Sequence, residues 1–226
     1  MNNKKSIEET LNYTFVMYEN SVRYLTICNY INYPARYEEY VKYKSNVDPA
    51  LLYHILNISP HFQQYQFFSW MLFIIEIQKI IGGSTDKFSL RAIKRVIKEK
   101  SYIEPQEFSP VIPKIDNFFS KNKKIIKQIR ELRNQKYAHS DYIKQMNEDI
   151  LFKDAWNLLD SIKEILEEFG EILDWGFSFL GPGHYLSNIS EFENHYLQLI
   201  NSTDSKDIAL INNLVGVDYL KKRGLK

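Results

Sequence analysis

The sequence predicts an all-α protein built around a four-helix up-and-down bundle, with further helices at both ends. Apolar residues recur every three or four positions along most of the chain, which is the spacing of one face of a helix. Glycine and proline are few, at 8 and 7 of 226 residues, and fall mainly between the periodic stretches. We expect residues 1–57 to form an N-terminal helical extension, 58–180 the bundle and 181–226 a C-terminal helical appendage.

Capping residues predict where the first helices begin. Ser6 and Glu9 have the spacing of a capping box, and the helix behind them should end near Pro34. Pro49 and Pro60 each follow a residue whose side chain can cap a helix, and proline suits the first helical position. The chain should therefore contain two further helix starts, at about residues 49 and 60.

Later boundaries follow from glycine, serine and a proline-containing loop. The helix from residue 60 should stop at Gly82-Gly83, because glycine accepts the left-handed conformation of a C-terminal cap. Ser89 should cap a shorter helix. A loop then leads to a long helix from about Lys114 to Gln145, and the next helix should cover residues 150–173.

Composition excludes some functional classes. The formal net charge is +1, so a nucleic-acid site would have to be a local patch. The most hydrophobic run, Phe67 to Ile75, is far shorter than the roughly 20 residues that span a bilayer. Two lysines near the N-terminus have no apolar region behind them, so we expect no signal peptide. The single cysteine, Cys28, lies in an apolar pattern and cannot form an intrachain disulfide, which favours a cytoplasmic protein with a buried, inert thiol.

The segment RELRNQKYAHSDY, residues 130–142, breaks the apolar pattern of the long helix. On a helical projection the apolar residues from Phe118 to Leu132 form one stripe, with Arg133 at about +60° and His139 at about −60° from its centre. The two are about 9 Å apart along the axis, so they do not meet on one straight helix. They suit one phosphodiester approached from two sides, and a second copy of the helix across a two-fold axis would make that pocket easier to build.

These side chains have the chemistry of metal-free RNA cleavage. His139 can exchange a proton with a ribose 2′-hydroxyl or a leaving 5′-oxygen, and Arg133 can bind the phosphate oxygens. The products would be a 2′,3′-cyclic phosphate and a 5′-hydroxyl, and DNA would resist. The alternative is that both residues are solvated or structurally hydrogen-bonded, as most such residues on helices are.

RNQKYAHSD, residues 133–141, resembles the signature of the HEPN superfamily, in which a histidine follows an arginine after a short spacer. AHSD is particularly similar to the abortive-infection (AbiU-type) branch, and the aromatic helix before it extends the resemblance over residues 58–173. The resemblance implies a dimeric four-helix domain with Arg133 and His139 at the interface. Many members are metal-independent endoribonucleases, toxins or antiviral effectors that cleave tRNA or mRNA, some with an antitoxin. Others are inactive and bind a nucleotide, RNA or a partner protein.

Several neighbouring residues are candidates for supporting roles, each with a structural alternative. Asn134 is the polar residue that usually follows the arginine. Glu76 either pairs with Arg130 or Arg133 or faces solvent at a helix edge, and Asp141 either orients His139 or caps the helix. The lysines of residues 121–127 either track phosphates or form a solvated face. The candidate RNA-binding residues are Arg130, Lys136, Tyr137 and Tyr142, although most tyrosines in this chain should be packing residues.

Other enzyme classes lack their motifs. The sequence contains no His-Glu-x-x-His motif, cysteine pair, glycine-rich phosphate loop or Gly-x-Ser-x-Gly elbow. The remaining histidines have no metal-ligand spacing, so we expect neither a metal nor a cofactor. The expected partners are a second copy of the chain and RNA, with an antitoxin as a further candidate.

Overall fold

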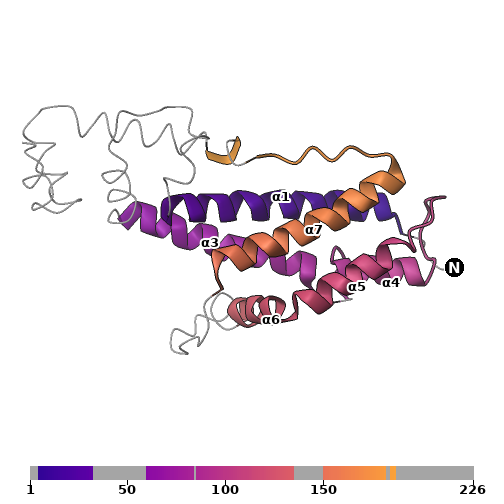
Figure 1. Cartoon of the computed structure of the whole chain (residues 1–226), viewed down its shortest axis with the longest axis horizontal. Coiled ribbons are helices and arrows are strands. Elements are labelled where there is room, and N and C mark those ends of the chain that lie inside the picture. The colour runs from indigo at the N-terminus through magenta and orange to yellow at the C-terminus, as the bar shows by residue number, and fades with distance from the viewer. Residues whose placement is uncertain (1–4, 33–59, 84, 135–149, 182–183, 187–226) are drawn as a thin grey trace, which may run out of the picture. The chain divides into compact units, whose positions relative to one another are not determined.

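The computed structural model describes residues 5–32, 60–83, 85–134, 150–181 and 184–186, and most of these are helical (Figure 1). Apart from one parallel β-bridge between Lys5 and Tyr102, no strand pairing occurs in these ranges. The all-α class is therefore confirmed. The helices are α1 (Ile7–Asn32), α3 (Pro60–Ile81), α4 (Leu90–Lys98), α5 (Val111–Lys121), α6 (Lys123–Leu132) and α7 (Phe152–Leu173).

Helix α1 begins and ends close to the predicted positions. Ser6 Oγ accepts a hydrogen bond from the Glu9 amide at 3.0 Å, which confirms the N-terminal cap. A distant residue completes it, because Glu104 Oε1 accepts from Ser6 Oγ at 2.7 Å and from the Glu8 amide at 3.1 Å. Burial raises the pKa of Glu104, but these hydrogen bonds outweigh it and the pKa lies below its ordinary value.

Helix α3 ends at Ile81 as predicted, but the two glycines that follow do not form the left-handed cap that we expected. Neither Gly82 nor Gly83 has a left-handed backbone. Instead, Asp86 folds back and its Oδ2 accepts from the Gly83 amide at 2.6 Å, so that a Cβ on Gly82 would overlap the carboxylate. Ser89 then caps α4 through the Ala92 amide, as predicted.

The predicted long helix from Lys114 to Gln145 begins earlier, at Val111, and is not continuous. The backbone departs from helical geometry at Asn122, with φ −99° and ψ 17°, and this residue separates α5 from α6. Its amide and its Nδ2 both donate to the Phe118 carbonyl at 3.0 Å, and its side chain is buried. A buried side-chain amide that bonds its own backbone competes with the helical ladder, so the chain breaks there.

Helix α7 lies within the predicted range of 150–173 and ends at the predicted residue, but it begins two residues later, and Leu151 precedes it and is 62% exposed. Ion pairs join the helices at their surfaces, Lys114 with Glu168 between α5 and α7, and Lys94 with Asp116 between α4 and α5. The residues buried along α7 are Ala155, Leu158, Leu159, Ile162, Ile165, Leu166, Phe169, Gly170 and Leu173.

The chain divides into two compact units, residues 1–25 with 71–179, and residues 26–70 with 180–226. The boundary expected near residue 57 lies outside the described residues. In the first unit the segment after α7 packs on α1: the rings of Phe15 and Phe177 are 4.8 Å apart, and those of Tyr18 and Phe179 are 5.5 Å apart. The first part of α1 is therefore packed into the same unit as α4 to α7.

The described ranges bear on two further expectations, the absence of a membrane-spanning helix and the burial of Cys28. None of the helices seen there combines the length and the apolar character that crossing a bilayer requires. Cys28, in the second unit, is buried as predicted, and burial raises the pKa of its thiol to about 12. At neutral pH that thiol is protonated and a poor nucleophile.

Candidate functional site

Helix α6 carries the first part of the motif. Its buried side is made of Ile125, Ile126, Ile129 and Leu132, which agrees with the projected apolar stripe. After Leu132 the helix widens into a π-helical turn at Arg133 and Asn134. Turns of this kind are rare and occur frequently at functional sites, because they re-aim the side chains that follow them.

Arg133 and Asn134 are both exposed at this turn. The Arg133 guanidinium donates one hydrogen bond, from Nη1 to Asn134 Oδ1 at 3.0 Å. A guanidinium has five N–H donors, and within the described ranges the other four donate to no protein group, so an anion with several oxygens could accept from them. The arrangement gives the arginine a neighbour that orients it without neutralising its charge.

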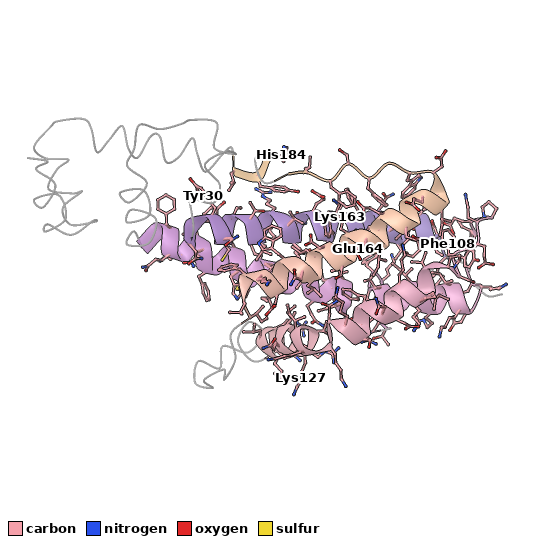
Figure 2. The ribbon with its side chains drawn as sticks, in the orientation of Figure 1. Tyr30, Phe108, Lys127, Lys163, Glu164 and His184 are labelled. Carbon is pink, nitrogen blue, oxygen red and sulfur yellow. The ribbon has the colours of Figure 1, made fainter. Side chains whose placement is uncertain are left out.

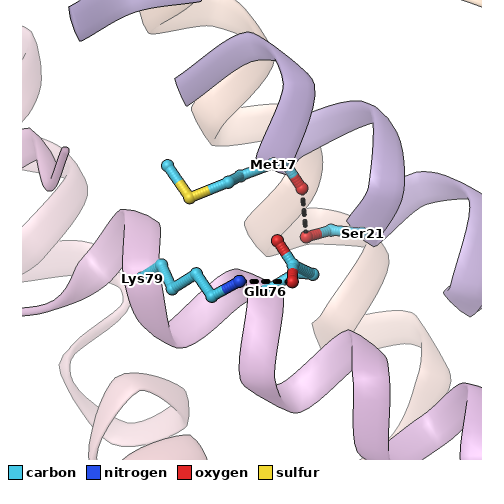
Figure 3. A network of polar contacts seen from close by, with 4 residues as sticks. All are labelled: Met17, Ser21, Glu76 and Lys79. Atoms are coloured by element: carbon cyan, nitrogen blue, oxygen red, sulfur yellow. Dashed lines mark hydrogen bonds and ion pairs between the residues drawn. The ribbon is translucent and has the colours of Figure 1, made fainter. Parts of the chain in front are cut away.

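Glu76 has a partner on its own helix. Its Oε1 accepts from Lys79 Nζ at 2.5 Å, and its side chain is only 13% exposed (Figure 3). The same view shows Ser21 Oγ donating to the Met17 carbonyl at 2.7 Å, a bond internal to α1. We expected Glu76 either to pair with Arg130 or Arg133 or to face solvent. Among the described residues it instead pairs with Lys79 and is mostly buried.

The second part of the motif cannot be placed. His139 and Asp141 lie outside the described residues, as do Lys136, Tyr137 and Tyr142, and their predicted roles stay predictions. Arg130 is described and is exposed one turn before Arg133. The described portion of the site therefore consists of Arg130, Arg133 and Asn134.

The exposed side of α6 is basic. Lys123, Lys127 and Arg130 are exposed and follow one another at helical spacing, and Lys124 is exposed beside them. The one acidic residue of the helix, Glu131, lies 3.7 Å from Lys127. Figure 2 shows Lys127 pointing outward from the ribbon.

Helix α7 has the opposite character, which we did not predict. Five acidic residues follow one another at intervals of three and four and are all exposed, and this charge periodicity is also visible in the sequence. Lys163 pairs with Glu167 at 3.6 Å, and Figure 2 places Lys163 beside Glu164 on this helix. The stripe consists of Asp160, Glu164, Glu167, Glu171 and Asp174.

The acidic stripe affects a buried neighbour. Tyr18 of α1 has a pKa well above its ordinary value, first because it is buried and then because Glu19, Asp160 and Glu167 disfavour a phenolate. Its ring packs against Phe179, so it is a core residue with a neutral hydroxyl at physiological pH.

No group of three or more potential metal-binding side chains (His, Cys, Asp, Glu) occurs among the residues that the structure describes. The described site is thus an exposed arginine and asparagine at a distorted helix end, next to a basic helix face. Comparison of the chain with protein-family models, with curated proteins and with solved structures gives no match in any of the three.

Proposed function

We propose that the chain is a metal-independent endoribonuclease of the HEPN type, acting in a toxin-antitoxin or phage-defence system. The observation that carries the proposal is Arg133: it is exposed at a π-helical turn, and among the described residues its guanidinium donates only to Asn134. The two non-bridging oxygens of a phosphodiester can accept hydrogen bonds from two N–H groups of such a guanidinium.

In the proposed reaction the ribose 2′-oxygen attacks the adjacent phosphorus and the bond from phosphorus to the 5′-oxygen breaks. His139 accepts the 2′-hydroxyl proton or donates one to the 5′-oxygen, and the histidine of a second subunit is available for the other transfer. Arg133 stabilises the negative charge that grows on the non-bridging oxygens. The products are a 2′,3′-cyclic phosphate and a 5′-hydroxyl.

The proposed assembly is a homodimer in which each subunit contributes a four-helix bundle and the Arg133 end of α6 lies near the two-fold axis. The described Arg133 has no second cationic side chain opposite it on its own helix, so a second copy is the simplest source of a two-sided site. The RNA substrate, tRNA or mRNA, and a cognate antitoxin in the cytoplasm belong to the same proposal.

The test is cleavage of total RNA by the purified full-length chain in EDTA, followed by sequencing of RNA 5′-hydroxyl ends. His139→Ala should lower cleavage by roughly 10²- to 10⁴-fold, the usual contribution of general acid-base catalysis. His184→Ala is the matched control, because His184 is exposed and lies outside the motif, and it should cleave like the parent. If parent and His139→Ala give the same ends, the mechanism is wrong.

A second pair of variants separates charge from geometry at the arginine. Arg133→Lys keeps the charge but loses the planar fork, so kcat should fall by roughly 10²-fold or more. Arg130→Lys, one turn earlier, should leave kcat within a few-fold. A folded, dimeric parent that binds RNA and yields no cyclic phosphate would instead identify a catalytically silent RNA-binding module.

A further inference from the structure

Three cations on α6 form one line. Lys123, Lys127 and Arg130 are spaced by four and three residues, which places them within about 60° of one another around the helix and along about 10 Å of its axis. All three are exposed, and the buried isoleucines occupy the opposite side. We call Lys123, Lys127 and Arg130 the basic stripe. It leads toward the π-helical turn that presents Arg133.

The rest of the helix does little to neutralise this stripe. Among the described residues, Lys127 has Glu131 at 3.7 Å with side chains 77% and 45% exposed, and Lys123 and Arg130 have no ion-pair partner. Lys123 is the first residue of α6 and lies at the positive end of the helix dipole, where a cation is unfavourable. The first turn contains no acidic residue that would offset this. Folding alone therefore gives no reason for this pattern of charge.

The stripe has a counterpart of opposite sign in the same compact unit. The acidic residues of α7, from Asp160 to Asp174, repel polyanions, and the near-zero net charge of the whole chain conceals this separation. A polyanion would be attracted to α6 and excluded from α7. Of these two helices, α6 is therefore the one that attracts an anionic strand, and the line of its basic stripe leads toward Arg133.

We propose that the basic stripe binds the phosphate backbone of single-stranded RNA next to the scissile phosphate. This inference rests on the proposed ribonuclease function, since it takes Arg133 as the position of the cleaved bond. The contacts are to phosphates and not to bases, so the stripe positions the strand without reading its sequence. It acts on the affinity for RNA and leaves the chemical step to the motif residues.

The experiment compares two double variants of the full-length protein. Lys123→Gln/Lys127→Gln removes two charges of the stripe, and Lys153→Gln/Lys163→Gln removes two from α7. The two pairs are similar in charge, because Lys127 and Lys163 each pair with a glutamate four residues later, at 3.7 and 3.6 Å, although Lys163 also lies 4.9 Å from the centre of the Phe179 ring. Binding is measured by fluorescence anisotropy with a labelled single-stranded DNA, which the proposed chemistry cannot cleave, and with RNA of the same sequence.

The stripe variant should bind the DNA roughly tenfold more weakly, whereas the α7 variant should bind about as well as the parent, because α7 does not contact the strand. The slope of log Kd against log salt should fall by about 1.4 in the stripe variant, since each phosphate contact to a single strand contributes about 0.7. On RNA the stripe variant should raise KM and leave kcat at saturation unchanged.

Equal affinities and equal salt slopes for the two double variants would overturn the proposal. So would a stripe variant that binds DNA normally but changes from dimer to monomer in size-exclusion chromatography, because the stripe would then be paired with a second copy. Failure of the ribonuclease function gives a different result: the DNA binding and its salt slope depend on the stripe, yet no cyclic phosphate forms from RNA with any variant.

Discussion

Helix α7 and the α5–α6 pair cover similar lengths of chain, 22 residues against 11 and 10, but they are built differently. Helix α7 is continuous and buries nine residues, including Phe169, whose exposed fraction is 0%. The α5–α6 pair is broken at Asn122 and ends in a π-helical turn. Continuous burial makes α7 a structural element, whereas the broken pair presents polar groups at its breaks, and the candidate site lies at one of them.

The largest expected effect tests whether α7 is the more important helix for stability. Phe169→Ala should lower the free energy of unfolding by roughly 3–5 kcal/mol, because the ring is fully buried against Phe108. Ile129→Ala on α6 removes a smaller buried side chain and should cost about 2–3 kcal/mol. Urea unfolding measures both. If Ile129→Ala is the more damaging substitution, the ranking of the two helices is wrong.

The second-largest effect concerns Gly170 near the end of α7, where the lack of a side chain lets the segment after the helix pack closely. A Cβ on Gly170 would lie 2.8 Å from the Trp175 carbonyl oxygen and 3.1 Å from the Phe177 ring. Gly170→Ala should therefore destabilise the protein by about 1–3 kcal/mol, although alanine favours helix by nearly 1 kcal/mol. Gly176→Ala is the control, since nothing lies within 4 Å of its Cβ position. Thermal unfolding of both variants measures the loss of stability, and an equal loss in the two would contradict the close contact at Gly170.

The sequence predicted the fold where local signals determine it, and missed it where distant segments meet. Ser6, Ser89 and Pro60 marked helix starts correctly because capping is a local interaction. Glu104 caps α1 from 96 residues away, which no local pattern reveals. Asn122 was missed because the apolar period continues across it from Phe118 to Ile125, so periodicity alone shows no break.

The candidate site was predictable to a similar extent. The projection placed Arg133 beside the buried stripe of the long helix, but it assumed an unbroken α-helix through residue 139. A π-helical turn begins after Leu132, and the apolar periodicity of the sequence does not show it. The lysines of the basic stripe were visible as a run in the sequence, but the exposure of the stripe, and the finding that among the described residues only Lys127 has an ion-pair partner, required the structure.

A smaller effect concerns pH and the segment that leads into α5. The folded-state pKa of Glu104 is lowered, so its ionised form stabilises the fold at neutral pH and that contribution is lost as the pH falls through the carboxyl range. Glu104→Gln should lower the free energy of unfolding by about 1 kcal/mol at pH 7. The difference in stability between the variant and the parent should shrink as the pH falls through that range. A constant difference across that range would show that the cap does not depend on charge.

The smallest expected change in stability is at Asn122, where the two regions differ most. Asn122→Ala loses the hydrogen bond to the Phe118 carbonyl, worth about 1 kcal/mol, and gains helix propensity of about 0.6 kcal/mol. The net change in the free energy of unfolding should stay below about 0.5 kcal/mol.

The effect of Asn122→Ala on activity should be larger, because a straighter α5–α6 pair displaces Arg133, and misplacement by about 1 Å can reduce a rate by roughly 10²-fold. Far-ultraviolet circular dichroism should show equal or slightly higher helicity, while RNA cleavage falls. Asn117→Ala is the control, because Asn117 is exposed on α5 and its replacement removes a side-chain amide without affecting the break at Asn122. If Asn122→Ala cleaves RNA like Asn117→Ala, the break has no role in positioning Arg133, and the contrast with α7 reflects packing alone.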